Sequence, residues 1–318
     1  MRGRARVVFA GTPQFALPTL EMLLRHPSVD LVGVVSQPDR RRGRGMRLSP
    51  SPVKQAACKA GIDCITPAAL RDDEASLAWL RAKRPDLLVV VAFGMLLPRP
   101  WLEAPAIAPV NLHASLLPRW RGAAPIERAL LAGDRTTGVS LMRMEQGLDT
   151  GPVYARRRCP ITGRTTGEAL RRRLAGLAAG LLADELDGLL SGGRTPEPQP
   201  EEGVCYAARI RPEERNIDWS GPARMVDRVV RCFALSPGAR CRIVGGPSAG
   251  RWLKVLDGLP GEGGRPAGRA VPTREGALEV GCGGGGVFRI TRLQPEGRAA
   301  MDAAAFCNGL RGEALQLG

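Results

Sequence analysis

The sequence predicts an α/β protein with a parallel-sheet domain followed by a smaller β-barrel. Residues 6–36 have the order strand, helix, strand, which is typical of a parallel sheet. Residues 87–92 form a continuous apolar run, as expected for a strand buried on both faces. After residue 203 the chain changes to short β-like segments between Gly and Pro turns, and five such segments indicate a small barrel.

The first part of the chain alternates strands and helices. Strands are expected at 6–10, 30–36, 64–66, 87–92, 108–112, 137–144 and 153–159. Helices are expected at 16–25, 53–60, 72–83, 125–132 and 166–190, with a helical turn at 101–104. Pro18 is tolerable in the first turn of its helix, and acidic residues open the helix at 72.

Residues 191–203 are rich in Gly, Pro and charge, so by composition they form a linker. Beyond them we expect a helix at 222–232 and a closing helix at 302–310. The barrel strands are expected at 240–244, 252–256, 270–272, 277–280 and 287–293, with a hairpin turn at 281–286. The expected domains are therefore 1–190, a linker at 191–205, and 206–318.

The chain of 318 residues has 46 Lys and Arg against 31 Asp and Glu, a formal net charge of +15. Such an excess, spread over both halves, favours a polyanionic partner and above all nucleic acid. The alternative is that the excess of Arg reflects a GC-rich genome, whose codons favour Arg, Ala and Gly, and the 40 glycines agree with this explanation.

Several classes of protein are disfavoured by composition. No apolar stretch approaches the roughly 20 residues that span a bilayer, and the apolar run after the basic N-terminus is too short for a signal peptide. The eight cysteines are scattered without CxxC or Cys/His ligand spacing, which argues against a zinc site or disulfide framework. We expect a cytoplasmic protein that binds neither metal nor membrane.

A dense cationic segment follows the second strand. Five arginines fall within residues 40–47, interrupted by glycines and followed by prolines, namely Arg40, Arg41, Arg42, Arg44 and Arg47. We expect a long mobile loop, neither a stable helix nor a central strand. Its guanidinium groups suit phosphate contacts, although a charge run can also be plain solvated surface.

Three polar residues are expected near one edge of the sheet: Asn111, His113 and Asp149. An Asn N–H can stabilise a developing oxyanion, and a histidine can exchange a proton at neutral pH. A carboxylate can orient that ring. Ser115 lacks a nucleophile-elbow motif, so the set suits direct attack by a substrate nucleophile on a carbonyl. The alternatives are a structural histidine and a solvent-facing carboxylate.

The turn after the first strand contains Gly11, Thr12, Pro13 and Phe15. A glycine there permits close approach of a ligand to the backbone. No GxGxxG or P-loop motif is present, so dinucleotide or NTP binding is poorly supported. A tight turn without further role is the other interpretation.

Taken together, the motifs resemble those of the 10-formyltetrahydrofolate-dependent formyltransferases. The shared elements are Asn111-Leu112-His113, Ser115-Leu116-Leu117-Pro118 with the PRWRGAAPI run, and the Gly-Leu-Asp-Thr-Gly of 147–151. A narrower set resembles the branch that acts on methionyl-initiator tRNA, and comprises FAGTPQFA at 9–16, QPDR at 37–40 with GRG at 43–45, SPVK at 51–54, YA at 206–207, IDW at 217–219 and LQPEGR at 293–298.

This resemblance implies a Rossmann-like N-terminal domain and an OB-like C-terminal barrel. It implies transfer of a formyl group from 10-formyltetrahydrofolate to the α-amine of methionyl-initiator tRNA, with Asn111, His113 and Asp149 as the catalytic set. Ser115, Leu116, Leu117 and Pro118 would line the folate site, and Gly11, Thr12, Pro13 and Phe15 the substrate pocket. The residue 40–47 loop would contact the tRNA acceptor stem, chiefly through Arg44. We expect a monomer.

Two other functions are alternatives to formylation of methionyl-initiator tRNA. A formyltransferase or formyltetrahydrofolate hydrolase acting on a small molecule, such as a glycinamide ribonucleotide or sugar nucleotide, needs neither the basic loop nor the Arg-rich second domain. A nucleic-acid-binding protein with an inactive enzyme domain is disfavoured by the intact Asn/His/Asp set.

Overall fold

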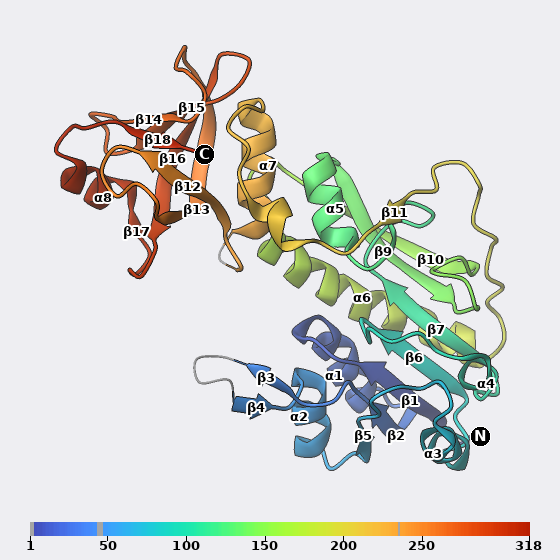
Figure 1. The fold of residues 1–318 in the computed structure, drawn as a ribbon. Coiled ribbons are helices and arrows are strands. Elements are labelled where there is room, and N and C mark those ends of the chain that lie inside the picture. The colour runs from blue at the N-terminus through green and yellow to red at the C-terminus, as the bar shows by residue number, and fades with distance from the viewer. Residues whose placement is uncertain (1–2, 43–46, 235) are drawn as a thin grey trace. The chain divides into compact units, whose positions relative to one another are not determined.

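A computed structural model describes residues 3–42, 47–234 and 236–318 (Figure 1). The chain forms two compact units. The first unit comprises Met1–Pro125, Thr136–Pro160 and Arg171–Ala208. The second comprises Ile126–Arg135, Ile161–Leu170 and Arg209–Gly318. The expected division into domains at 1–190 and 206–318 with a linker at 191–205 stays a prediction.

The first unit is built on a seven-stranded sheet with the order β10-β9-β7-β6-β1-β2-β5. Its strands are β1 Ala5–Gly11, β2 Val29–Val35, β5 Cys64–Ile65, β6 Leu87–Val91, β7 Ala108–His113, β9 Thr136–Arg143 and β10 Val153–Pro160. The five strands from β5 to β7 are parallel, which confirms the Rossmann-like α/β architecture. Strand β9 runs antiparallel to both β7 and β10. The loop at 144–152 is too short for the crossover that a parallel β9–β10 pair would need.

Helices follow the strands as the sequence predicts. They are η1 Gln14–Ala16, α1 Leu17–Arg25, α2 Pro52–Lys59, α3 Glu74–Ala82, α4 Arg99–Leu102, α5 Pro125–Ala132 and α6 Gly167–Leu190. Side-chain caps begin three of them. The Ser51 Oγ accepts from the Lys54 N–H at 3.0 Å, Asp73 Oδ1 from the Ser76 N–H at 3.0 Å, and Thr166 Oγ1 from the Ala169 N–H at 3.3 Å. Strands β1 and β6 supply Val8 and Leu88, both fully buried, to a core closed by Leu80 and Trp101.

The cationic segment differs from the expectation. Instead of a loop, it forms a β-hairpin of β3 Arg40–Arg42 and β4 Arg47–Ser49, with Arg41 opposite Leu48 (Figure 1). An isolated two-stranded ribbon tolerates this composition because both strands are edges, and the side chains of Arg40, Arg41 and Arg47 are exposed to water. The prediction that the segment is no central strand is confirmed, since the hairpin is a sheet of its own. Arg44 lies outside the described residues.

The second unit contains a closed barrel, as predicted. Its strands are β12 Ala239–Gly245, β13 Trp252–Glu262, β14 Arg269–Pro272, β15 Leu278–Gly281, β16 Gly286–Pro295 and β18 Leu315–Leu317. The order β13-β12-β18-β14-β15-β16 closes through pairing of β13 with β16, and β17 pairs with β16 in addition. The further elements are η2 Pro212–Arg215, α7 Ala223–Phe233, β17 Met301–Asp302 and α8 Ala303–Leu310.

One pairing in the first unit joins distant parts of the sequence. β8, Arg121–Gly122, pairs in parallel with β11, Tyr206–Ala207. An added Cβ on Gly122, whose φ is +114°, would lie 3.0 Å from the Ala207 carbonyl oxygen, so glycine permits this close approach. No helix in the described parts of the chain has both the length and the apolar character to cross a bilayer.

Candidate active site

Strand β7 presents two polar side chains at its carboxyl end. Asn111 and His113 are two residues apart, so both project from the same face of the sheet. Leu112 between them is 2% exposed and points into the core. The neighbours of β7 are β6 on one side, where Val90 pairs with Asn111, and β9 on the other, where Ser140 pairs with His113. The two polar groups therefore stand on a strand that is held on both edges.

The loop after β9 brings a carboxylate to these two side chains. Asp149 Oδ1 lies 3.4 Å from Asn111 Nδ2, and Asp149 Oδ2 lies 3.5 Å from His113 Nδ1. Gly122 donates its backbone N–H to Asp149 Oδ2 at 2.8 Å. The structure thus brings together all three residues that the sequence singled out, and adds the β8 backbone as a further partner of the carboxylate.

The imidazole of His113 is held in one orientation. Its Nε2 is 2.8 Å from the Trp120 carbonyl oxygen, which can only accept, so Nε2 carries a hydrogen. Nδ1 then faces Asp149, and a doubly protonated ring can donate on both sides. The His113 side chain is 7% exposed and that of Asp149 is 14% exposed. This burial strengthens the interaction between them.

The backbone around the site is conformationally unusual. Asp149 has φ +53° and Trp120 has φ +61°, in the left-handed region that non-glycine residues seldom occupy. An added Cβ on Gly151 would meet the Arg143 carbonyl oxygen at 1.9 Å, so no side chain fits there. Surrounding contacts must hold both loops in place, and such conformations cluster at functional sites.

The segment from Ser115 to Pro118 is fixed from within. Ser115 Oγ donates to the Arg119 carbonyl at 2.6 Å. Ser140 Oγ donates to the Ser115 carbonyl at 2.8 Å and accepts from the Leu117 N–H at 3.0 Å. Leu117 is 2% exposed in a small apolar cluster, and the Leu117–Pro118 peptide bond is cis. Leu116 and Pro118 are half-buried, so these two side chains are the better placed to meet a ligand.

The turn after β1 has internal partners too. Thr12 Oγ1 donates to the Phe93 carbonyl at 2.9 Å, and Phe15 is 7% exposed. An added Cβ on Gly11 would lie 2.7 Å from the Phe9 ring, so packing accounts for this glycine. Pro13 precedes η1 in extended backbone. Whether these residues line a substrate pocket stays a prediction.

Gln199, which lies in the expected linker at 191–205, contacts the site although nothing in its sequence context indicated this. Its Nε2 donates to the Asp149 carbonyl at 2.8 Å and to the Gly151 carbonyl at 2.7 Å. Its Oε1 accepts from Arg121 Nε and Nη2 at 3.0 and 2.8 Å. The proline-rich composition of 191–203 conceals this role, and no sequence signal read from one chain would have revealed it.

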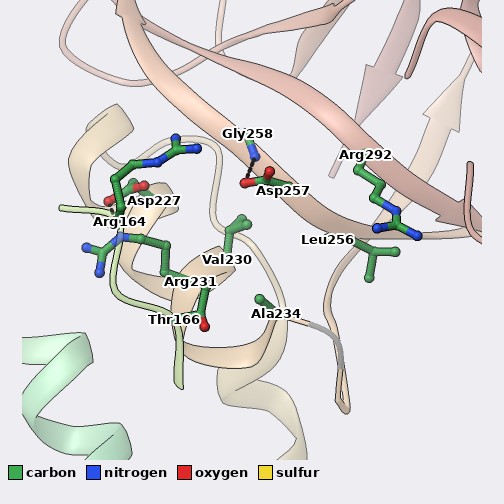
Figure 2. Close-up of a pocket in the computed structure, with 10 residues that line it drawn as sticks. All are labelled: Arg164, Thr166, Asp227, Val230, Arg231, Ala234, Leu256, Asp257, Gly258 and Arg292. Carbon is green, nitrogen blue, oxygen red and sulfur yellow. Dashed lines mark hydrogen bonds and ion pairs between the residues drawn. The ribbon is translucent and has the colours of Figure 1, made fainter. Parts of the chain in front are cut away.

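A separate pocket lies in the second unit. Figure 2 shows its lining, which comprises Arg164, Thr166, Asp227, Val230, Arg231, Ala234, Leu256, Asp257, Gly258 and Arg292. Arg231 is engaged there, because it donates to Asp227 at 2.7 Å and to the Thr165 carbonyl at 3.0 Å. None of the residues predicted for catalysis lines this pocket, so it is distinct from the His113 site. Within the described residues, no cluster of His, Cys, Asp and Glu could hold a metal ion.

Comparison with known families assigns both parts of the chain. Residues 5–186 match the formyl transferase family model, and residues 209–311 match the formyl transferase C-terminal domain. The chain belongs to the formyl transferase family. It is 47% identical over 315 residues to the methionyl-tRNA formyltransferase of Halorhodospira halophila, covering 98% of this chain and 99% of the relative. The resemblance found in the sequence is thereby confirmed.

Solved structures share the fold at low sequence identity. An N-formyltransferase from Helicobacter canadensis, crystallised with folinic acid and dTDP-3-aminofucose, gives a TM-score of 0.64 at 16% identity, over 92% of this chain and 99% of that chain. HypX from Aquifex aeolicus, in complex with tetrahydrofolic acid, gives 0.61 at 18% identity, over 97% of this chain and 48% of that one.

Proposed function

We propose that this formyltransferase transfers the formyl group of 10-formyltetrahydrofolate to the α-amine of methionyl-initiator tRNA, and that Asn111, His113 and Asp149 carry the reaction. The observation that supports these roles most directly is the convergence of the three side chains, with Asp149 3.4 Å from Asn111 and 3.5 Å from His113. Near-full-length identity of 47% to a methionyl-tRNA formyltransferase supports the choice of substrates.

The reaction needs a stabilised oxyanion and one proton transfer. The free amine attacks the formyl carbon, a C–N bond forms, and the carbonyl oxygen becomes negative. Asn111 Nδ2 donates a hydrogen bond to that oxygen, and a protonated His113, whose ring nitrogens face Trp120 and Asp149, stabilises it through its positive charge. Asp149 holds the imidazole and relays the proton lost by the amine, through water, to N10 of the folate as the old C–N bond breaks. No covalent enzyme intermediate and no metal are required.

The remaining assignments follow the same logic. Leu116 and Pro118, with Ser115 and Leu117 fixing the turn, line the folate site, and Gly11, Thr12, Pro13 and Phe15 border the methionyl end. Arg40, Arg41, Arg42, Arg44 and Arg47 contact phosphates of the acceptor stem. The basic second unit binds the body of the tRNA. The protein acts as a cytoplasmic monomer.

Incubation with 10-formyltetrahydrofolate and methionyl-initiator tRNA tests the proposal. The expected product is formyl-methionine on the tRNA, detected after mild hydrolysis of the ester. Uncharged tRNA and free methionine are the controls, and an amino-sugar nucleotide tests the small-molecule rival. Formylation of the amino sugar in preference to methionyl-tRNA would refute the proposal.

A further inference from the structure

We infer that Gln199 is a positioning residue for formyl transfer, which fixes the Asp149 loop relative to strand β8. The inference rests on the proposed function, because it gives Gln199 a part in the same site. Gln199 is half-buried and belongs to a segment that composition alone marks as a linker. Its amide nevertheless makes four hydrogen bonds, to the residues immediately around Asp149 and to Arg121.

The hydrogen bonds use the full capacity of the amide. Both N–H groups are taken by the carbonyls of Asp149 and Gly151, at 2.8 and 2.7 Å. The oxygen accepts two N–H groups from the Arg121 guanidinium, at 3.0 and 2.8 Å. A flipped amide would set oxygen against two carbonyls and nitrogen against a cation, so only one orientation is favourable. Gln199 therefore recognises both loops through a single arrangement.

The two loops that Gln199 joins are the ones whose spacing determines the site. Asp149 Oδ2 accepts the Gly122 N–H at 2.8 Å, and Arg121 immediately precedes Gly122. Gln199 thus forms a second connection, parallel to the Asp149–Gly122 hydrogen bond. The left-handed backbone of Asp149, with φ +53°, needs such support to persist. Without it, the carboxylate can move away from Asn111 and His113.

Gln199 belongs to residues 197–207, a segment that we call the brace and that is anchored at both ends. Glu197 pairs with Val153 through backbone bonds of 2.8 and 2.9 Å. At the other end, the Cys205 carbonyl accepts the Arg121 N–H at 3.0 Å, and β11 pairs with β8. The brace lies along both loops, so the glutamine is in position before any substrate arrives.

Steady-state kinetics of methionyl-tRNA formylation by the full chain provide the first test. Gln199→Ala is expected to lower kcat by about 10–100-fold while the KM for each substrate changes less than about threefold, because misplaced groups cost chiefly in the transition state. Gln199→Glu keeps the acceptor for Arg121 but loses both donors, so it should be equally slow. Ser191→Ala removes a side-chain hydrogen bond from the same segment, to the Gly188 carbonyl at 3.2 Å, and should retain the wild-type rate.

A double-mutant cycle distinguishes a residue that positions Asp149 from one that only holds the two loops together. The formylation rate of Asp149→Asn variants is measured in a single turnover with excess enzyme. Adding Gln199→Ala to Asp149→Asn should lower this rate by less than about twofold, because the group that Gln199 positions is already disabled. A structural tether would lower the rate by the same factor in both backgrounds, and that result would overturn the inference. Wild-type kcat in Gln199→Ala would overturn it as well.

Thermal unfolding of each variant shows whether the rates come from folded protein. If Gln199→Ala does not fold, Gln199→Glu, which keeps the shape and the Arg121 contact, takes its place in the kinetics and the cycle. A wild-type chain that leaves methionyl-tRNA unformylated would refute the proposed function itself. An active wild type matched by both Gln199 variants would refute only the role of Gln199.

Discussion

The His113 site and the arginine hairpin follow two parallel strands of one sheet, β7 and β2, yet they are built in opposite ways. Each polar group of the site has partners within the chain: His113 contacts Trp120 and Asp149, and Asp149 also contacts Asn111 and Gly122. In the hairpin, β3 and β4 pair with one another, and an ion pair of 2.8 Å between Lys54 and Asp39 anchors the residue before β3.

This difference reflects two kinds of task. Stabilising a transition state requires groups whose geometry is fixed beforehand and shielded from water. Contacting a phosphate backbone requires charge and reach, and works through solvated side chains. Changes at the site should therefore act on kcat, whereas changes at the hairpin should act on KM and on salt dependence.

The largest effect is expected from removing the central pair. His113→Ala and Asp149→Ala should each lower kcat by about 10²–10⁴-fold, the range associated with losing a proton-transfer or oxyanion-stabilising group. Both variants should stay folded, since the surrounding sheet is intact, and circular dichroism checks this. Near-normal formylation rates in both would refute the catalytic assignment.

A smaller effect is expected from disturbing the loop alone. In Gly151→Ala the new methyl would meet the Arg143 carbonyl oxygen at 1.9 Å, so the loop must shift. A displacement of this kind should lower kcat by about 10²-fold or less. Gly163→Ala, where no atom lies within 4 Å of the added Cβ, is the matched control and should keep full activity. Equal activity of the two variants would mean that the loop tolerates displacement.

A weaker, salt-dependent effect is expected at the hairpin. Arg44→Ala and Arg41→Ala should each raise the KM for methionyl-tRNA by several-fold, which corresponds to about 1 kcal/mol of binding free energy lost with one phosphate contact. The kcat at saturation should change little. Each should also make the dependence of KM on salt less steep. Kinetics at two salt concentrations check this, and a KM that stays at the wild-type value in both would show that the hairpin does not contact tRNA.

The smallest effect on activity is expected from a charge cluster in the second unit. In the barrel, Glu279 accepts from Arg265 at 2.8 Å and from Arg289 at 3.0 Å, and the Arg265 hydrogen bond is the main cause of its lowered pKa. A lowered carboxyl pKa stabilises the fold above the unfolded value of about 4.3 and loses this contribution as pH falls through the folded value.

Glu279→Gln should therefore destabilise the protein at pH 7 by about 1 kcal/mol, since the partly exposed arginines limit the gain. The difference from wild type should shrink below pH of about 4. Urea unfolding at both pH values measures it, and formylation at pH 7 should be unchanged. A difference that does not depend on pH would show that packing, rather than charge, is involved.

The sequence alone predicted the features that come from strong local patterns. The apolar run of β6, the strand expected at 108–112 that became β7, and the short β-like segments of the barrel all led to correct elements. Asp149 was expected beside Asn111 and His113, and the resemblance implied that it holds the histidine. Because β9 runs antiparallel to β7, it is the loop at 144–152 that brings the carboxylate to the ring.

The features that were missed depend on contacts between distant residues. Hairpin β3–β4 pairs arginine-rich strands that propensity disfavours, and β18 is only three residues long, too short to give a periodic signal. The antiparallel direction of β9 and β10 and the hydrogen bonds of Gln199 likewise arise from the folded arrangement. Composition did not indicate a role for the brace, because the hydrogen-bond partners of Gln199 lie about 50 and 78 residues away in the sequence.

The short strand β18 also has a consequence for synthesis. It pairs with β12 and with β14, so the barrel cannot close before residue 317 has left the ribosome. At translation rates of about 5–20 residues per second, the edge of β12 waits roughly 4–14 s for a partner that lies about 70 residues downstream. An open strand edge can pair with other chains during that time. Nascent chains of this protein therefore pass through an interval in which the barrel is vulnerable to aggregation, after the strands of the catalytic sheet have already been made.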